Sequence, residues 1–394
     1  MTSPSQALAT ASTHSLRQRG TSGPKVSYAE LFFDLVYVFA VTQTSHYLLT
    51  HLSLEGALQT LLLWFAVWLG WQYTCWVSNW FDPEMMPVRS LLFAAMLLAL
   101  PMAAALPYAF EPGGGWVFAG CFVTLQVGRT LWVLFMLGAG HALTPNFQRI
   151  LGWTLIASAF WLAGAACDDT HGRMALWALA AASEYISPMF GLWLPGLGRS
   201  QTSDWTIDGG HLAERCQLFI IVALGESILL TGATFSEAKT WDSWTVAAFA
   251  CAFVTALAMW WLYFDTSSKE ASHAIEHADD PGRLGAYFHY IHVLIVAGII
   301  VAAVGSELLI AHPHAALEGK SLAVMLGSFV FFIAGNALFR RIVLGRWAPS
   351  LMFSLLVLPL LAYIGHGWPL IWVAGLLTLL IAGVALFDSC LQRH

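Results

Sequence analysis

Residues 284–306 read LGAYFHYIHVLIVAGIIVAAVGS, a run that contains no Asp, Glu, Lys or Arg. An α-helix rises about 1.5 Å per residue, so about 20 such residues cross the roughly 30 Å hydrocarbon core of a bilayer. This stretch therefore predicts a membrane-spanning helix at 284–310. The rest of the chain repeats the pattern.

Comparable apolar runs recur from residue 30 to the C-terminus and predict about twelve membrane-spanning helices in an all-α, polytopic fold. The last two runs are joined by a short link, His366–Pro369. The expected spans are 30–49, 57–79, 90–110, 115–138, 148–167, 173–195, 212–234, 243–264, 284–310, 321–341, 349–366 and 368–389.

The composition supports the same fold class. Of the 394 residues, 58% are hydrophobic and only 10% are charged, whereas a soluble domain carries about 25% charged residues. So few charges could not cover a soluble fold of this size, but lipid solvates apolar side chains directly. The 17 Lys and Arg are scattered, so we expect no nucleic-acid partner. The six cysteines form no CxxC pair, and we expect no disulfide framework, metal or cofactor.

The Lys and Arg residues predict the orientation, because cytoplasmic loops of membrane proteins carry an excess of both. With the N-terminus inside, twelve of the 17 fall on the cytoplasmic side. The bias supports an even number of spans with both termini in the cytoplasm. The inside set is Arg17, Arg19, Lys25, Arg89, Arg149, Arg199, Lys269, Arg283, Arg340, Arg341, Arg346 and Arg393; the outside set is Arg173, Lys239 and Lys320; Arg129 and Arg215 lie within predicted helices.

Matching motifs predict that the chain is built as two parallel six-helix repeats, related by an axis along the membrane normal. We place the repeats at 30–200 and 201–394, after a disordered cytoplasmic tail at 1–29. The matched pairs are Glu30 with Glu214, Asp82 with Asp265 (each after two aromatic residues), and Gly128-Arg129 with Gly335-Asn336.

Charged residues deep in a predicted span are the first functional candidates, because a charge in hydrocarbon costs at least about 2.5–3.5 kcal/mol. Glu30 and Asp34 lie one turn apart on one face of the first span. Glu214 and Arg215 open the seventh span, and Glu226 lies near its middle. These side chains either line a path for an ion or proton or serve as structural partners.

Three further residues extend this set. Glu184 lies deep in the sixth span, one turn before Pro188, which can break the helix and leave carbonyls free to bind a cation. Arg129 lies at a depth where a guanidinium needs a carboxylate such as Asp34, in a structural bridge or an anion site. Asn336 is the counterpart of Arg129 in the second half.

Asp82, Asp265, His289 and His292 form a candidate polar cluster near the cytoplasmic side. Acids and histidines together could hold a divalent metal, although their spacing matches no ligand pattern. The segment at 273–277 fits the H-x-x-E-H pattern of some zinc peptidases, but five-residue matches arise easily. We therefore expect no catalytic residues and no metal ligands.

Several motifs resemble those of one family. Residues 30–40, ELFFDLVYVFA, resemble the N-terminal signature of the bacterial low temperature requirement protein A family. Residues 211–215, HLAER, and 223–227, ALGES, resemble its second signature, and 260–265 and 298–307 also fit. The resemblance implies a multi-pass protein of the bacterial cytoplasmic membrane, without an established substrate or catalytic set.

Three functions fit these features. The first is a transporter or channel for a small ion or solute, proton-coupled through Asp34 or Glu226, with its path between the two halves. The second is a membrane-embedded enzyme acting on a lipid or isoprenoid at the candidate polar cluster. The third is a membrane sensor or scaffold. We favour the first, in contact with membrane lipids, and a homo-oligomer is compatible with the sequence.

Overall fold

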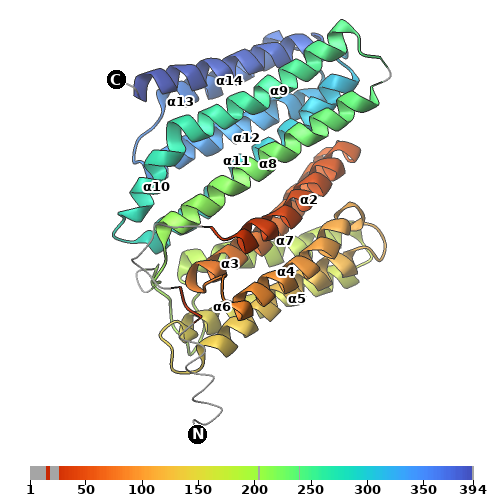
Figure 1. Ribbon diagram of the computed structural model, residues 1–394. Helices are drawn as coiled ribbons and strands as arrows, with labels where there is room; N and C mark the ends of the chain where they lie inside the picture. Colours follow the sequence, from red (N-terminus) through yellow and green to blue (C-terminus); the bar gives the residue numbers. More distant parts are fainter. Residues whose placement is uncertain (1–14, 18–25, 203–204, 239, 393–394) are drawn as a thin grey trace. The chain divides into compact units, whose positions relative to one another are not determined.

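The computed structural model describes residues 15–17, 26–202, 205–238 and 240–392, which form α-helices joined by loops (Figure 1). No strand occurs in these ranges. Most of the predicted tail at 1–29 lies outside the described residues, and for that part the disorder stays a prediction. The long helices are α2 (Tyr28–Thr50), α3 (Leu54–Trp80), α4 (Met86–Ala104), α5 (Gly115–Leu137), α6 (Thr144–Ala166), α7 (Thr170–Ile186), α8 (Gly209–Glu237), α9 (Ser243–Tyr263), α11 (Pro281–Ala311), α12 (Gly319–Val343), α13 (Pro349–Ile364) and α14 (Leu370–Gln392).

Each of the twelve predicted spans coincides with one of these helices. Nine spans in the described part of the chain are long and apolar enough to cross a bilayer. The other three helices are α2, which carries Glu30 and Asp34, and α7 and α13, which have 17 and 16 residues. The structure thus supports a multi-pass membrane protein, while the full set of twelve spans stays a prediction.

Several helix ends differ from the prediction at prolines, and two of them show the effect clearly. α4 begins at Met86 rather than at 90, since Pro87 suits the first turn of a helix, where a backbone N–H has no partner. α7 ends at Ile186 rather than at 195, because Pro188 enters a 3-10 turn, Ser187–Phe190 (η2).

One segment expected to be a loop is helical. After α9 the chain continues through a wide π-helical turn, Phe264–Ser268 (η4), into the short helix α10 (Lys269–Glu276). Wide turns of this kind are rare and occur frequently at functional sites.

The contacts divide the chain into two compact units. Unit 1 comprises Met1–Thr44, Ala57–Arg215 and Asp279–Arg283, and unit 2 comprises Ser45–Gly56, Cys216–Ala278 and Leu284–His394. Residues 28–44 of α2 and 209–215 of α8 therefore belong to unit 1, and the remainders of both helices belong to unit 2. The repeat relation between the halves stays a prediction.

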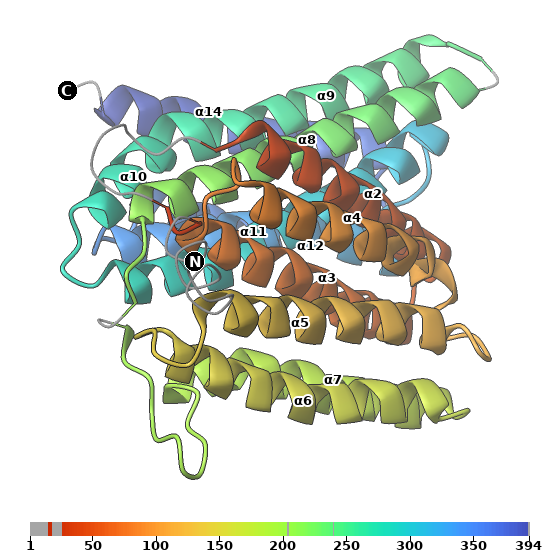
Figure 2. The ribbon, with the colours of Figure 1, turned by 60° about the horizontal axis from the view of Figure 1, so that its bottom comes forward.

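Aromatic side chains form much of the core of unit 1, where α5, α6 and α7 lie side by side (Figures 1 and 2). Trp161 of α6 and Trp177 of α7 pack with Phe118 and Phe122 of α5, with ring centroids 5.0 to 6.2 Å apart. Gly164 permits this packing, because a Cβ atom there would lie 2.4 Å from the Trp177 ring. Each such ring buries about 150–250 Å².

Small residues allow close helix packing in unit 2. A Cβ atom at Gly298 of α11 would lie 2.6 Å from the backbone nitrogen of Phe332 in α12, so the two backbones nearly touch there. This is a common device of helices packed in membranes, where apolar burial alone does not drive association.

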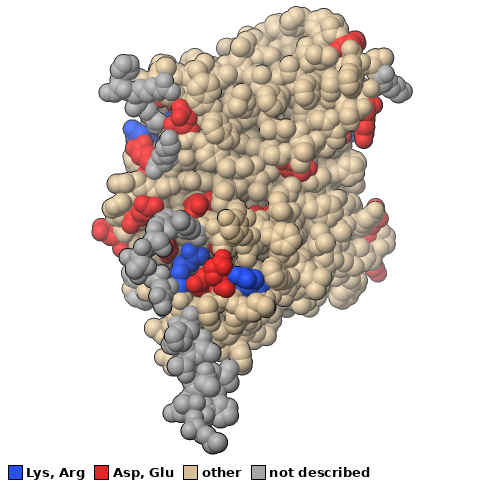
Figure 3. Space-filling model, in the orientation of Figure 1, with Lys and Arg blue, Asp and Glu red and all other residues tan. Residues whose placement is uncertain are grey.

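The outer surface carries large apolar side chains. Leu97, Phe135, Leu356 and Leu379 are each at least two-thirds exposed. On the face in Figure 3, charged side chains form small groups on a wide uncharged surface. Such a surface would be an aggregation hazard in water and is suited to lipid.

Candidate functional site

Two acids and an arginine meet inside unit 1. The Nη2 of Arg215 in α8 donates to Oδ1 of Asp34 in α2 at 2.7 Å, and its Nη1 lies 4.0 Å from Oε1 of Glu30. The three side chains are at most 1% exposed. Together with His211 and Arg17 they form what we call the Asp34 cluster. The predicted candidates Glu30, Asp34 and Arg215 are thus brought together.

Helix α3 provides further contacts to this cluster. Trp71 donates from Nε1 to Oδ1 of Asp34 at 2.7 Å, so that oxygen accepts two hydrogen bonds. The Arg215 guanidinium lies 3.2 Å from Sγ of Cys75 and 5.8 Å from the Trp71 ring centroid. One helix turn separates Trp71 from Cys75, which places both on the same face of α3.

Glu30 also stabilises the start of α2. Its Oε2 accepts from the backbone N–H of Ser27 at 2.9 Å, and the Ser27 hydroxyl oxygen accepts from the Glu30 N–H at 3.2 Å. This reciprocal capping box satisfies two N–H groups at the helix start. The Ser27-x-x-Glu30 spacing is a sequence signal that could have indicated this role.

The proton on His211 can be placed from its neighbours. Asn79 is oriented by Asp208, since its Nδ2 donates to the Asp208 carbonyl at 2.8 Å and its Oδ1 accepts the Asp208 N–H at 2.9 Å. The Asn79 Nδ2 faces Nδ1 of His211 at 3.1 Å, so Nδ1 accepts. The ring proton is then on Nε2 and is donated to Glu30 at 2.9 Å. We assign a neutral His211 on these contacts.

Arg17 supplies the second positive charge of the cluster. Its Nη2 donates to the Ser78 carbonyl at 3.1 Å and lies 3.7 Å from Oε2 of Glu30. The same nitrogen is 3.2 Å from Nε2 of His211, but both atoms carry hydrogen in our assignment, so we count this approach as packing. Two carboxylates therefore face two guanidinium groups.

The Asp34–Arg215 pair is bonded incompletely. Oδ2 of Asp34 and Nε and Nη1 of Arg215 are buried and lack a hydrogen-bond partner within the described ranges. An arginine and a carboxylate commonly form two parallel hydrogen bonds, whereas this pair forms one. A buried polar atom without a partner costs about 1–3 kcal/mol, so such atoms are uncommon in folded proteins and call for an explanation.

A second polar network surrounds Arg129 of α5. Its Nη1 donates to the carbonyl of Gly70 at 3.2 Å and to the Thr74 hydroxyl at 3.0 Å, and its Nη2 donates to Oε1 of Gln126. We expected a carboxylate such as Asp34 beside this guanidinium. That expectation was wrong for the described residues, because Asp34 pairs with Arg215 and neutral oxygens satisfy Arg129.

Glu184 closes the Arg129 network. Its Oε1 accepts from Gln126 at 3.0 Å and its Oε2 accepts from Trp161 at 3.0 Å. The Ser187 and Pro188 carbonyls accept the N–H groups of Leu192 and Gly191, and cation binding by carbonyls near Pro188 stays a prediction. Gln126 thus connects a buried positive charge to a buried acid.

Helix α3 is shared by the two networks. Gly70 and Thr74 face Arg129, while Trp71 and Cys75, one residue later, face the Asp34 cluster. Tyr37 of α2 packs over the same turn of α3, and its buried hydroxyl lacks a partner among described residues. Polar groups therefore run through unit 1 from Glu30 to Glu184.

The remaining residues that were predicted to line a transport path lie outside these two networks. Glu214 is half-buried in α8, with a buried Oε2 that has no partner in the described ranges. Glu226 belongs to unit 2, is 7% exposed, and makes no hydrogen bond or ion pair with the described residues. Asn336 donates to the carbonyl of Phe332 in its own helix at 2.8 Å.

The candidate polar cluster is not supported as a metal site. Asp82 accepts the Glu84 N–H, and Asp265 is exposed and accepts from Trp261 at 3.0 Å. The structure, as far as it is described, contains no group of three or more His, Cys, Asp or Glu that could hold a metal.

The histidines of that cluster have partners near them. Nδ1 of His292 lies 2.6 Å from the Phe288 carbonyl and Nε2 lies 2.6 Å from the Tyr263 hydroxyl. Nδ1 of His289 lies 2.9 Å from the Gly285 carbonyl. Both ring nitrogens of His292 are therefore occupied.

Unit 2 contains a buried ion pair that the sequence did not indicate. Arg340 of α12 donates from Nη1 to Asp388 of α14, from Nε to the Ser267 hydroxyl at 2.8 Å, and from Nη2 to the Thr266 hydroxyl. The wide turn η4 supplies both hydroxyls. We had counted Arg340 in the inside set, at the cytoplasmic end of the predicted span 321–341, without a partner.

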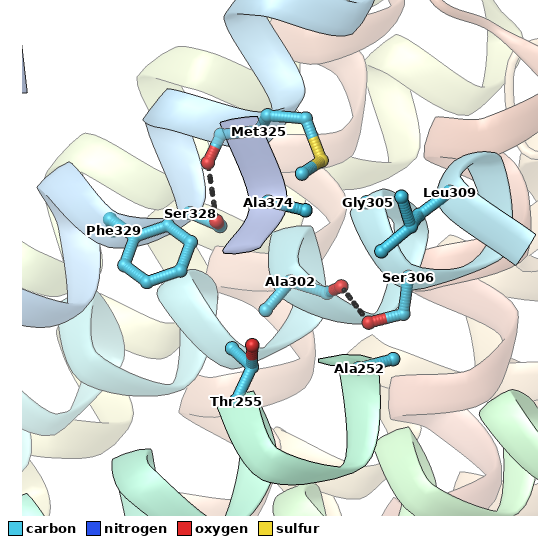
Figure 4. Close-up of a pocket in the computed structure, with 10 residues that line it drawn as sticks. All are labelled: Ala252, Thr255, Ala302, Gly305, Ser306, Leu309, Met325, Ser328, Phe329 and Ala374. Atoms are coloured by element: carbon cyan, nitrogen blue, oxygen red, sulfur yellow. Dashed lines mark hydrogen bonds between the residues drawn. The ribbon is translucent and has the colours of Figure 1, made fainter. Parts of the chain in front are cut away.

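A small cavity lies between α9, α11, α12 and α14 of unit 2 (Figure 4). Its volume of about 20 Å³ is enough for one water molecule. The hydroxyls of Thr255, Ser306 and Ser328 line it, and each donates to a carbonyl of its own helix at 2.8 or 2.9 Å. The cavity is too small for an organic substrate.

The chain is similar to a bacterial protein family and to a bacterial relative. The profile of the family described as Bacterial low temperature requirement A protein matches residues 25–386. The uncharacterized protein RA0937 of Rhizobium meliloti (strain 1021) is 40% identical over 333 residues, which cover 84% of this chain and 80% of the relative.

Proposed function

The chain belongs to the bacterial low temperature requirement A protein family, and we propose that it is a transporter or channel for a small ion or solute in the bacterial cytoplasmic membrane. The proposal includes twelve spans in two parallel repeats, with both termini in the cytoplasm. Midplane acids in a repeat architecture are typical of transport proteins.

The incompletely bonded Asp34–Arg215 pair carries this proposal. A purely structural pair is stabilising only when its donors and acceptors are fully used, because desolvation of both charges must be offset. Here one carboxylate oxygen and two guanidinium nitrogens are left over. They offer an acceptor and two donors to a passing ion, proton or polar group.

The geometry also suggests how the pair exchanges partners. Glu30 lies 4.0 Å from Nη1 of Arg215, so the guanidinium has a second carboxylate within reach. A proton or cation on Asp34 would cancel its attraction for Arg215, which would then pair with Glu30. Two alternative pairings of one arginine form a two-state element that the transported species can bias.

Glu30 is the fixed member of this exchange, because the capping box and His211 hold both of its oxygens. Asp34 is the exchanging member. In a proton-coupled version Asp34 gains and loses the proton, with Glu226 as a second candidate in unit 2.

Flux measurements in proteoliposomes test the proposal. The purified chain is reconstituted, and potassium, sodium and proton gradients are imposed in turn while internal pH and membrane potential are followed. We expect flux with at least one cation and its loss in Asp34→Asn. The matched control is Glu270→Gln, which removes an acid from an exposed ion pair with Arg346. Undiminished flux in folded Asp34→Asn would exclude the pair as the site.

A further inference from the structure

A groove on the outside of unit 1 runs along α6 and α7, which lie side by side in Figure 2. Its volume is about 530 Å³, within the range of about 300–1,000 Å³ that is typical of small-molecule sites. The walls are apolar, and the aromatic residues among them are Trp153, Phe160, Phe190 and Trp193.

The end of the groove near η2 is rigidly built. Arg149 donates from Nε to the Leu197 carbonyl at 3.0 Å, and Trp153 donates to the Trp193 carbonyl at 3.1 Å. Gly191 turns the chain at a φ of 66° that other residues rarely adopt, and its carbonyl accepts the Ser200 N–H at 2.7 Å. These contacts hold the loop after η2 against α6.

Two polar groups at this end have unused hydrogen-bonding capacity. Ser187 is 3% exposed, lines the groove, and has a buried hydroxyl without a partner in the described ranges. Arg199 also lines the groove, is exposed, and makes no hydrogen bond or ion pair with the described residues. The groove thus combines an apolar wall with a buried hydroxyl and an exposed guanidinium.

We propose that the groove binds one anionic phospholipid. An acyl chain lies along the apolar wall, an ester carbonyl accepts from the Ser187 hydroxyl, and the phosphate lies against Arg199. Arg199 belongs to the predicted cytoplasmic set, and the cytoplasmic leaflet carries the anionic lipids. The aromatic rim suits the depth at which headgroups meet acyl chains.

Thermal unfolding of the detergent-solubilised full chain tests this site. The protein is titrated with phosphatidylglycerol, with phosphatidylcholine carrying the same acyl chains, or with inorganic phosphate. We expect saturable stabilisation by phosphatidylglycerol that exceeds that by phosphatidylcholine, and none by phosphate. Equal stabilisation by phosphatidylcholine, or stabilisation by phosphate alone, would overturn the proposal.

Variants separate the headgroup contact from the groove. Arg199→Gln is expected to weaken phosphatidylglycerol binding by about fivefold, the effect of one arginine near a membrane surface. Ser187→Ala should also weaken it, and Ala182→Trp should block the groove to both lipids. The matched control is Arg283→Gln, an exposed arginine of unit 1 outside the groove.

Crosslinking gives a readout that does not depend on stability. Phosphatidylglycerol with a photoactivatable group in one acyl chain should label peptides of α6 and α7 in the native protein. The label should disappear in Ala182→Trp and persist in Arg283→Gln. Labelling of other helices only, or a phosphatidylglycerol titration unchanged in Arg199→Gln, would contradict the assignment.

Discussion

Each unit contains a buried arginine–aspartate pair, and the two pairs differ in how completely they are bonded. In unit 2 all three guanidinium nitrogens of Arg340 donate, to Asp388 and to two hydroxyls of η4. In unit 1 only Nη2 of Arg215 donates, and Oδ2 of Asp34 has no partner among the described residues.

The difference distinguishes a structural pair from one available for function. Full bonding fixes one geometry, so the Arg340–Asp388 pair is suited to hold α12, α14 and η4 together. Incomplete bonding leaves an energetic cost that packing elsewhere must offset. Arg215 lies near both Asp34 and Glu30, so the incompletely bonded guanidinium can change from one carboxylate to the other.

The largest expected effect is on activity. In Asp34→Asn we expect flux to fall to the level of protein-free liposomes, because the amide cannot take up or release a proton or bind a cation as a carboxylate does. Asn retains an oxygen for the Trp71 hydrogen bond, and Arg215 can pair with Glu30 instead, so the fold should persist. Circular dichroism and size-exclusion chromatography check the fold, and ion flux checks the activity.

The next effect is on stability. Arg340→Met should lower the free energy of unfolding by about 3–5 kcal/mol, since it leaves Asp388 buried and unpaired. The double variant Arg340→Met/Asp388→Leu should recover most of this loss, because apolar residues of similar volume replace a buried pair at little cost. Thermal or denaturant unfolding measures both, and a double variant no better than the single one would contradict a purely structural pair.

A smaller effect is expected at Asn79. In Asn79→Asp the group facing Nδ1 of His211 becomes an acceptor, so His211 should hold two protons instead of one. The lost hydrogen bond to the Asp208 carbonyl should cost about 1 kcal/mol. Imidazole ¹⁵N chemical shifts report the protonation of His211, and shifts identical to those of the unsubstituted protein would show that our proton assignment is wrong.

The smallest effect is expected at an exposed pair. Glu270 and Arg346 are 49% and 57% exposed, and solvent-exposed pairs contribute about 0–1 kcal/mol. Glu270→Gln should therefore leave flux unchanged and stability nearly so. A large loss of flux or of stability in this variant would show that burial and hydrogen bonding do not distinguish functional ion pairs from non-functional ones in this protein.

The helical fold could be predicted from the sequence because each span needs a long apolar run, and residues 284–306 are an unambiguous case. Helix ends were less predictable where proline acts, as at Pro87 and Pro188. Short helices such as α10 lack the apolar run and could not be found this way.

The candidate site was predictable in part. Glu30, Asp34 and Arg215 could be recognised because a charge within an apolar helix is costly in hydrocarbon, and the structure brings these three residues together. Their pairing could not be predicted, because it depends on helix rotation and packing, and so Arg129 was paired with the wrong class of partner. His211 lies one turn before Arg215, a spacing that could have included it.

Other parts of the networks carried no distinctive signal. Gln126 and Trp71 are ordinary residues of apolar helices until a neighbouring charge gives them a role. Asp388 is a single acid near the end of the last span, and nothing in its flanking sequence points to Arg340.

The measurement that tests the central claim most directly is a side-by-side flux assay of two folded variants in the same liposomes. Asp34→Asn changes the incompletely bonded pair, and Arg340→Met/Asp388→Leu removes the fully bonded one. We predict that the first variant loses flux while the second keeps it at the level of the unsubstituted protein. Retained flux in Asp34→Asn together with lost flux in the double variant would contradict the account.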